Sequence, residues 1–161
     1  MVTNVYRDSK YQDPLQVGLE YQDFVIDVLG RRNFPLQIYS SKRWQYNKGE
    51  SPQRWEIKLD NRCVETGRLS IEIAEKTRAN QIVWIQSGIY RTDSWFYVQG
   101  NYQRFFIFMT KHMRLLYESG RYQVYEKPTI KTFYISLDDA RKFGEEIVPK
   151  QEDYQIAHPE T

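Results

Sequence analysis

Residues 54–76, RWEIKLDNRCVETGRLSIEIAEK, contain two short runs in which apolar side chains alternate with charged or polar ones. The first run covers residues 55–60 and the second covers residues 69–74. A strand with one buried face and one face toward solvent produces this alternation. Gly67 lies between the runs and can adopt the positive φ of a tight turn. The stretch therefore predicts a β-hairpin with one apolar face and one strongly charged face.

The composition is that of a folded, single-core protein. The chain has 161 residues, of which 40% are hydrophobic and 16% aromatic, too apolar for a disordered chain. The net charge is only +2, so any contact with nucleic acid has to come from a local basic patch. We expect one domain over residues 1–161, with an N-terminal arm at 1–13 and a polar tail at 150–161.

Cysteine usage and hydropathy indicate the compartment. Cys63 is the single cysteine, which excludes an intramolecular disulfide framework and suits a reducing compartment. No window approaches the roughly 18 to 20 apolar residues needed to span a bilayer. The first residues lack the apolar core of a signal peptide. We therefore expect a cytoplasmic protein with no membrane partner.

The remaining chain alternates between helical and extended patterns. Pro14 can open a helix whose apolar residues recur at helical spacing up to Gly30. Ser136 can cap a second helix over 136–148, and Thr110 one over 110–120. Further strands are expected at 34–46, 94–100, 104–109 and 129–137. This order predicts an α/β (α+β) domain in which a central mixed β-sheet is flanked by helices.

The charged face of the expected hairpin brings two carboxylates together. If the chain turns about Thr66, Asp60 faces Glu72 and Lys58 faces Ala74, and residues 56, 58, 60, 72, 74 and 76 share one face. Two facing carboxylates repel each other unless a divalent cation lies between them. Mg²⁺ binds through one or two carboxylates and keeps several waters. Asp60 and Glu72 are therefore candidate metal ligands; the alternative is a solvated sheet face crossed by ordinary ion pairs.

Three stretches carry a resemblance to a known family: GLEYQDF (18–24) with Glu20, EIKLD (56–60) with Asp60, and SIEIAEK (70–76) with Glu72. The segment QSGIYRTDSWFYV (86–98) also looks like one that some members carry. Over residues 14–120 the arrangement resembles the PD-(D/E)XK nuclease superfamily. In that family a helix bearing a Glu precedes three strands, the second with an Asp and the third with a (D/E)-x-K motif.

The resemblance implies a restriction-endonuclease-like core and Mg²⁺-dependent hydrolysis of DNA phosphodiesters, with Mn²⁺ as a substitute. Endonuclease action is favoured over exonuclease action, and a homodimer would match the two strands of a duplex. Asp60 and Glu72 would hold the metal, with the carbonyl of Ile73 as a further ligand. Glu20 would lie at the edge of the site and orient a metal-bound water or a second ion.

Ala74 departs from the family pattern, which usually has Lys at this position. Lys58 from the facing strand, or Lys76 on the same strand, can supply the missing ammonium, because the lysine stem is long. If neither reaches the metal, a catalytically inactive nucleic-acid-binding domain of the same fold describes the chain better. An unrelated aromatic-rich β domain that binds a partner is the third possibility.

Several other polar residues have a plain structural interpretation. His112 is expected at the surface or at a helix cap, and Cys63 in the packing of the core. Basic residues flank the expected site and can bind DNA phosphates, although scattered solvated charge is the alternative: Arg31, Arg32, Lys42, Arg43, Lys48 and Arg54.

Overall fold

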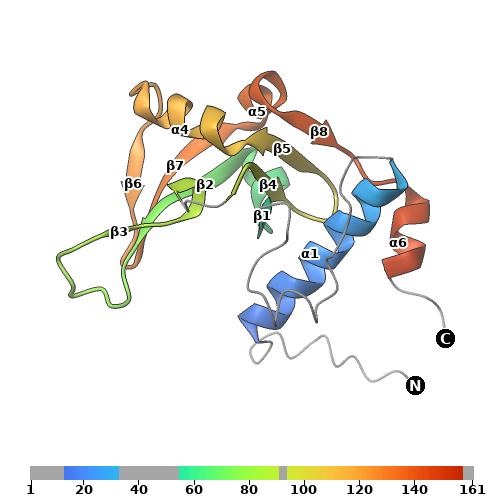
Figure 1. Cartoon of the computed structure of the whole chain (residues 1–161), viewed down its shortest axis with the longest axis horizontal. Coiled ribbons are helices and arrows are strands. Elements are labelled where there is room, and N and C mark those ends of the chain that lie inside the picture. The colour runs from blue at the N-terminus through green and yellow to red at the C-terminus, as the bar shows by residue number, and fades with distance from the viewer. Residues whose placement is uncertain (1–12, 33–54, 91–93, 158–161) are drawn as a thin grey trace.

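The computed structural model describes residues 13–32, 55–90 and 94–157 (Figure 1). The expected arm at 1–13 therefore lies almost wholly outside the described residues, and so do the expected strand at 34–46 and four of the six flanking basic residues. In chain order the elements are α1 (Pro14–Arg31), β1 (Trp55–Leu59), α3 (Cys63–Thr66), β2 (Arg68–Glu75), β3 (Ile85–Gln86), the 3-10 helix η3 (Gly88–Tyr90), β4 (Phe96–Gly100), β5 (Phe105–Met109), α4 (Thr110–Glu118), β6 (Val124–Glu126), β7 (Ile130–Ser136), α5 (Leu137–Phe143), β8 (Glu145–Ile147) and α6 (Gln151–Ala157).

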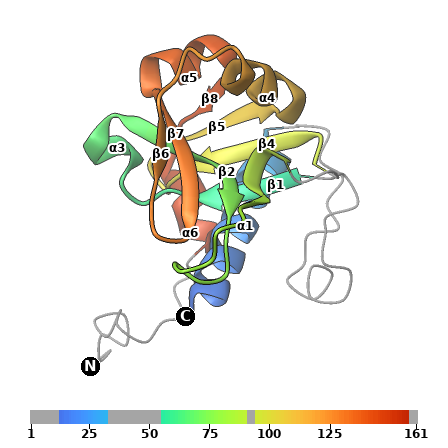
Figure 2. The same cartoon turned by 90° about the vertical axis from the view of Figure 1, so that its left-hand side faces the viewer.

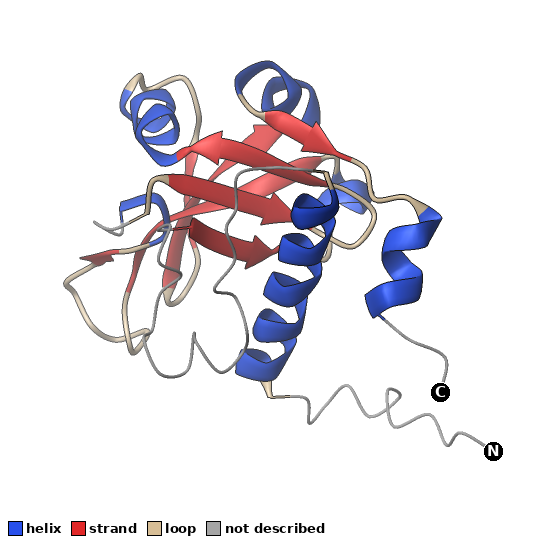
Figure 3. Cartoon of the chain, turned by 45° about the vertical axis from the view of Figure 1, so that its right-hand side comes forward, coloured by secondary structure: helices blue, strands red, loops and turns tan. Residues whose placement is uncertain are grey.

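The strands form two four-stranded sheets (Figure 3). The first has the order β1-β4-β5-β8 and is mixed, because β1 runs parallel to β4 while β5 is antiparallel to both of its neighbours. The second has the order β3-β2-β7-β6 and is antiparallel throughout. The expected mixed α/β class is confirmed, but the described strands build two sheets where one central sheet was expected.

The expected hairpin between residues 55–60 and 69–74 is wrong, although both strands exist. β1 pairs in parallel with β4, and β2 pairs with β7, so the two strands belong to different sheets. The connection is the short helix α3, in which the hydroxyl of Thr66 donates to the carbonyl of Arg62 at 2.9 Å and the Cys63 side chain is buried. Gly67 has the expected positive φ of 70°, but it ends this helix. The partners of both strands come from residues far along the chain, which local alternation does not reveal.

Helix α1 packs against the mixed sheet (Figure 1). Asp13 caps its N-terminus by accepting a hydrogen bond from the backbone N–H of Leu15, and Pro14 occupies the first turn, as expected. The expected apolar stripe is mostly confirmed, because Val17 is half-buried and its other four side chains are buried: Tyr21, Phe24, Val25 and Val28. The helix ends at Arg31, one residue beyond Gly30.

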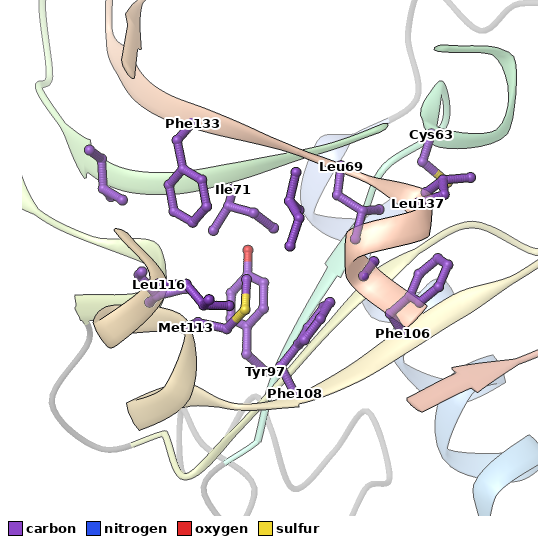
Figure 4. Close-up of a cluster of buried hydrophobic side chains, with 14 residues drawn as sticks. Cys63, Leu69, Ile71, Tyr97, Phe106, Phe108, Met113, Leu116, Phe133 and Leu137 are labelled. Carbon is purple, nitrogen blue, oxygen red and sulfur yellow. The ribbon is translucent and has the colours of Figure 1, made fainter. Parts of the chain in front are cut away.

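The main hydrophobic core lies between the two sheets, as Figure 4 shows. The mixed sheet contributes Tyr97, Phe106 and Phe108, and the antiparallel sheet contributes side chains such as Ile71 and Phe133. Helices α4 and α5 add further buried residues and lie above β5 and β7 in Figure 2. Cys63 belongs to this core, which confirms its expected packing role.

The C-terminal segment differs from the sequence expectation in two places. Ser136 caps α5 as expected, but the helix ends at Phe143 and residues 145–147 form β8. The chain then continues into α6 where a polar tail was expected. Asp153 of α6 is buried and lies 3.0 Å from Arg31 of α1 in an ion pair. A polar segment therefore docks because its carboxylate finds a partner on another helix.

In the described ranges, no helix is both long enough and apolar enough to cross a membrane.

Candidate functional site

A cavity of about 320 Å³ lies at the end of β1, where both sheets contribute to its walls. Two carboxylates line it, Asp60 and Glu72. Four cationic side chains also line it: Lys58, Arg62, Arg68 and Lys127. The cavity therefore combines oxygen ligands with a surplus of positive charge, which suits a phosphate-containing ligand beside a cation.

Asp60 is held at the junction of the two sheets. Its backbone N–H donates to the carbonyl of Gly100 at 2.7 Å and so extends the contact between β1 and β4. Its Oδ2 accepts hydrogen bonds from the backbone N–H of Ser70 at 3.0 Å and from Nε2 of Gln99 at 2.9 Å. Nε2 of Gln99 also donates to the carbonyl of Ser70 at 2.7 Å. The side chains of Asp60 and Gln99 thus make the hydrogen bonds to the backbone N–H and carbonyl of Ser70 that a neighbouring strand would otherwise make.

A buried tyrosine sets the orientation of Gln99. The hydroxyl of Tyr97 donates to Oε1 of Gln99 at 2.6 Å, so Nε2 of that amide faces Asp60. Burial raises the pKa of Tyr97 well above its ordinary value of 10, and the negative charges of Glu56, Glu72 and Asp60 raise it further. The phenol therefore stays protonated and remains a hydrogen-bond donor.

Glu72 and Lys58 lie near each other at the cavity. Oε1 of Glu72 accepts a hydrogen bond from the hydroxyl of Ser87 at 2.6 Å. Nζ of Lys58 lies 3.0 Å from Oε1 of Glu56 and 4.0 Å from Oε2 of Glu72. The ammonium therefore lies between two carboxylates from different sheets, which places it beside the cavity's acidic residues.

A β-bulge in β2 changes which residues share a face with Glu72. Glu72 pairs with Thr132 and Ala74 pairs with Lys131, so the strand has one additional residue, Ile73. Cross-strand partners lie on the same face, and Thr132 and Lys131 lie on opposite faces of β7. Ala74 therefore faces away from Glu72, and the expectation that residues 72, 74 and 76 share a face is wrong.

The structure places Lys76 away from the cavity. Its Nζ donates to the carbonyl of Gln81 at 3.0 Å and lies 4.4 Å from the ring centre of Trp84. Nζ of Lys131 lies over the same ring at 4.9 Å, as expected for two lysines on one face. The carbonyl of Ile73 accepts a hydrogen bond from the N–H of Ser87 at 3.1 Å, and Ile73 does not line the cavity.

Glu20 also lies outside the cavity. It is exposed on α1, where its Oε1 accepts a hydrogen bond from Nε2 of Gln16 at 2.9 Å. Arg31 and Arg32, expected to flank the site, instead pair with Asp153 of α6 at 3.0 and 3.9 Å. Of the residues expected at the site, the cavity thus contains three: Lys58, Asp60 and Glu72.

Four polar residues that sequence reasoning missed complete the site: Tyr97, Gln99, Ser87 and Thr132. Thr132 is only 2% exposed, lines the cavity, and has no hydrogen-bond partner for its hydroxyl among the described residues. Such an orphaned buried hydroxyl is costly unless a ligand or water satisfies it. A polar residue in an otherwise apolar strand run, such as Gln99 in FYVQG, was the signal available in the sequence.

The donor set suits a hard cation. Oδ1 of Asp60 makes no hydrogen bond within the described ranges, and Glu72 and the orphaned Thr132 hydroxyl add further oxygens. The same ranges contain no group of three or more His, Cys, Asp or Glu side chains that could hold a metal ion. One or two carboxylates supplemented by water are enough for Mg²⁺, so these residues are chemically compatible with that ion.

Searches against protein-family models, curated proteins and solved structures found no match to this chain.

Proposed function

We propose that the chain is a Mg²⁺-dependent nuclease with a PD-(D/E)XK-type, restriction-endonuclease-like core, which hydrolyses DNA phosphodiester bonds in this cavity. One observation carries the proposal: Lys58 and Asp60 from the end of β1 and Glu72 from β2 line one cavity that has further cations at Arg62, Arg68 and Lys127. An acidic centre surrounded by basic residues is the arrangement that binds a metal ion and a polyanion together.

The spacing on β1 adds support. Glu56 and Lys58 are two residues apart, and their side chains are in contact at 3.0 Å. This is the acid-x-lysine spacing that the resemblance expected at Glu72 and position 74. We therefore assign the lysine of the motif to Lys58 on β1, which makes a lysine at position 74 unnecessary.

The residues have separate roles in this proposal. Asp60 and Glu72 would hold Mg²⁺, which polarises a phosphate and lowers the pKa of bound water. Gln99 and Ser87 keep the two carboxylates in place by hydrogen bonds at 2.9 and 2.6 Å. Lys58 stabilises the negative charge that builds up on the phosphate oxygens during attack by water.

A non-catalytic DNA-binding domain is the second candidate, because Ala74 stands where the family usually has a lysine and faces away from Glu72. Cleavage separates the two candidates. DNA binding without cleavage in Mg²⁺ or Mn²⁺ supports the second.

The test compares the full chain with Asp60→Asn, Glu72→Gln and the matched control Asp138→Asn. Asp138 is an exposed carboxylate on α5, outside the cavity. Mg²⁺ is expected to raise the melting temperature of the wild type and the control but not of the cavity variants, because binding to the native state alone stabilises it. Closed circular single-stranded DNA and labelled linear duplex then report cleavage, and only an endonuclease cuts the circle. Equal Mg²⁺ stabilisation in all four proteins would refute the metal site.

A further inference from the structure

The cavity lining includes a cation–π pair of arginine and tyrosine that the proposed hydrolysis does not use. Cζ of Arg68 lies 3.9 Å from the ring centre of Tyr134, and both residues line the cavity. The ring of Tyr125 meets Tyr134 edge-on, with centroids 4.9 Å apart. Tyr134 is therefore held by a neighbouring ring, and it holds the planar guanidinium of Arg68 in turn.

The orphaned hydroxyl of Thr132 lies on the same face of the sheet. Thr132 and Tyr134 are two residues apart on β7, about 7 Å along the strand. On β2, Thr132 pairs with Glu72 and Tyr134 pairs with Ser70. One nucleotide spans such a separation between its base and its phosphate. A phosphate at Thr132 would lie directly beside Glu72, one of the proposed metal ligands.

We propose that this face, defined by Arg68, Thr132 and Tyr134, binds an unpaired nucleotide of DNA. The base stacks on the exposed side of the Arg68 guanidinium, which Tyr134 supports from the other side, and the Thr132 hydroxyl donates to a phosphate oxygen. Unpaired bases commonly stack on aromatic rings and on arginine planes, and they do so with little sequence preference.

The size of the cavity favours an unpaired substrate. A volume of about 320 Å³ is at the lower end of the range for small-molecule sites. One nucleotide fits such a space, whereas the bases of an intact duplex remain in their stack and reach only the rim. The substrate class that follows is single-stranded DNA, or a duplex with an unpaired nucleotide at the scissile phosphate. This inference rests on the proposed function for the choice of DNA as ligand.

Binding without cleavage tests the inference. Fluorescence anisotropy with a labelled oligo-dT single strand and a labelled duplex of equal length is measured in EDTA. The variant Arg68→Lys keeps the positive charge but removes the planar guanidinium. Its affinity for the single strand is expected to fall about tenfold, while its affinity for the duplex changes less than about twofold. Arg121→Lys is the matched control, because Arg121 also lies over an aromatic ring, 5.8 Å from that of Phe143, but outside the cavity.

Thr132→Val is the second variant, since valine keeps the shape and removes the orphaned hydroxyl. Its affinity for the single strand is expected to fall about fivefold, while its stability in urea stays equal to the wild type or rises. A residue with a merely structural role would show the reverse pattern, lower stability with unchanged binding. That reverse result would overturn the role of Thr132.

The outcomes separate this inference from the proposed function. If Arg68→Lys loses single-strand binding and the wild type cleaves no DNA with Mg²⁺, the nucleotide subsite is retained and hydrolysis is refuted. Cleavage of single-stranded DNA at an unchanged rate by Arg68→Lys retains hydrolysis and refutes the subsite. Equal loss for both DNAs, no loss for either, or no DNA binding by the wild type also overturns the subsite.

Discussion

The side-chain amide of Gln99 lies 2.9 Å from the carboxylate of Asp60, and through this contact a residue of β4 fixes the acidic residue that follows β1. The same amide nitrogen donates to the Ser70 carbonyl at 2.7 Å, and the amide oxygen accepts from Tyr97 at 2.6 Å. Gln99 is only 3% exposed, so water does not replace these partners. A single buried amide thus joins the two sheets at the candidate site.

Replacing Gln99 by leucine is expected to lower the free energy of unfolding by about 3 kcal/mol. The change leaves the Ser70 carbonyl and the Tyr97 hydroxyl without their partner, and each buried orphan costs about 1–3 kcal/mol. Urea unfolding measures the difference. Gln103→Leu is the control, because Gln103 is exposed and surface changes usually stay within about 0.5 kcal/mol. A Gln99→Leu protein as stable as this control would show that the amide does not join the sheets.

Lys58 is expected to be the catalytic lysine. Removing it as Lys58→Ala should lower single-turnover cleavage by about 100-fold or more, because charge stabilisation at the phosphate is lost. Lys76→Ala should stay within about twofold of the wild type, since Lys76 binds the Gln81 carbonyl and Trp84 on the opposite face. Labelled single-stranded DNA with Mg²⁺ is the substrate.

The bulge at Ile73 adds a second expectation to this test. Ala74 is 8% exposed and faces away from Glu72, so Ala74→Lys would bury an ammonium and is expected to destabilise the fold. The double variant of Lys58→Ala with Ala74→Lys should therefore remain inactive. Recovery of cleavage in that double variant would show that position 74 reaches the site after all.

The local elements could be predicted from the sequence because their signals are local. Alternation marked β1 and β2, and helical spacing with Pro14 marked α1. Asp60, Glu72 and Lys58 were expected together, and all three line the cavity. Their grouping was inferred from a hairpin that does not exist, so a different geometry from the expected one brings them together, and their roles stay predictions.

The rest depends on contacts between distant residues. The pairing of β1 with β4 spans about 40 positions, as Trp55 opposite Phe96 shows, and no pattern within 54–76 encodes it. The bulge at Ile73 reverses the faces beyond it, which strict period two does not anticipate. In the sequence, Gln99 and Thr132 are only polar residues within apolar strands. The fold places Gln99 beside Asp60 and Thr132 beside Glu72.

Stability is expected to fall between pH 9 and pH 11 because of Cys63. Burial, and to a lesser degree the charge of Asp60, raises the pKa of this thiol from 9.0 to about 11. Below pH 9 the thiol is protonated in both states, so its contribution is fully present. Between these values the unfolded chain loses the proton while the folded chain keeps it, so stability falls as pH rises, by about 2 kcal/mol at pH 11.

Urea unfolding at pH 8, 9.5 and 11 measures this dependence, with Cys63→Ala as the comparison. The variant should lose less stability between pH 8 and pH 9.5 than the wild type. Above pH 10 both proteins should weaken together, because burial also raises the pKa of Tyr97 and Tyr21. Identical slopes for the two proteins below pH 10 would contradict the assignment to Cys63.

Gly88 is expected to tolerate no side chain. Its φ is +58°, and a Cβ there would lie 2.1 Å from the carbonyl oxygen of Glu72. Gly88→Ala therefore has to push η3 away from β2, and we expect it to destabilise the protein by more than about 3 kcal/mol. Gly18→Ala is the matched control, since nothing lies within 4 Å of a Cβ at this helical position and alanine favours the helix. Thermal unfolding of the two variants should therefore shift in opposite directions.

Ser87, the residue before Gly88, is expected to act on the position of Glu72 instead of on the fold. Ser87→Ala removes the hydroxyl that donates to Oε1 of Glu72 at 2.6 Å and leaves the backbone contact with Ile73 in place. Loss of such an outer partner typically weakens metal binding by about 10- to 100-fold. Stability without metal should change much less than in Gly88→Ala, because the Glu72 carboxylate keeps Lys58 nearby, with 4.0 Å between Nζ and Oε2. Isothermal titration with Mg²⁺, together with urea unfolding in EDTA, separates the two effects. A Ser87→Ala protein with unchanged Mg²⁺ affinity would mean that Glu72 either needs no support or binds no metal, and the Glu72→Gln titration distinguishes between these.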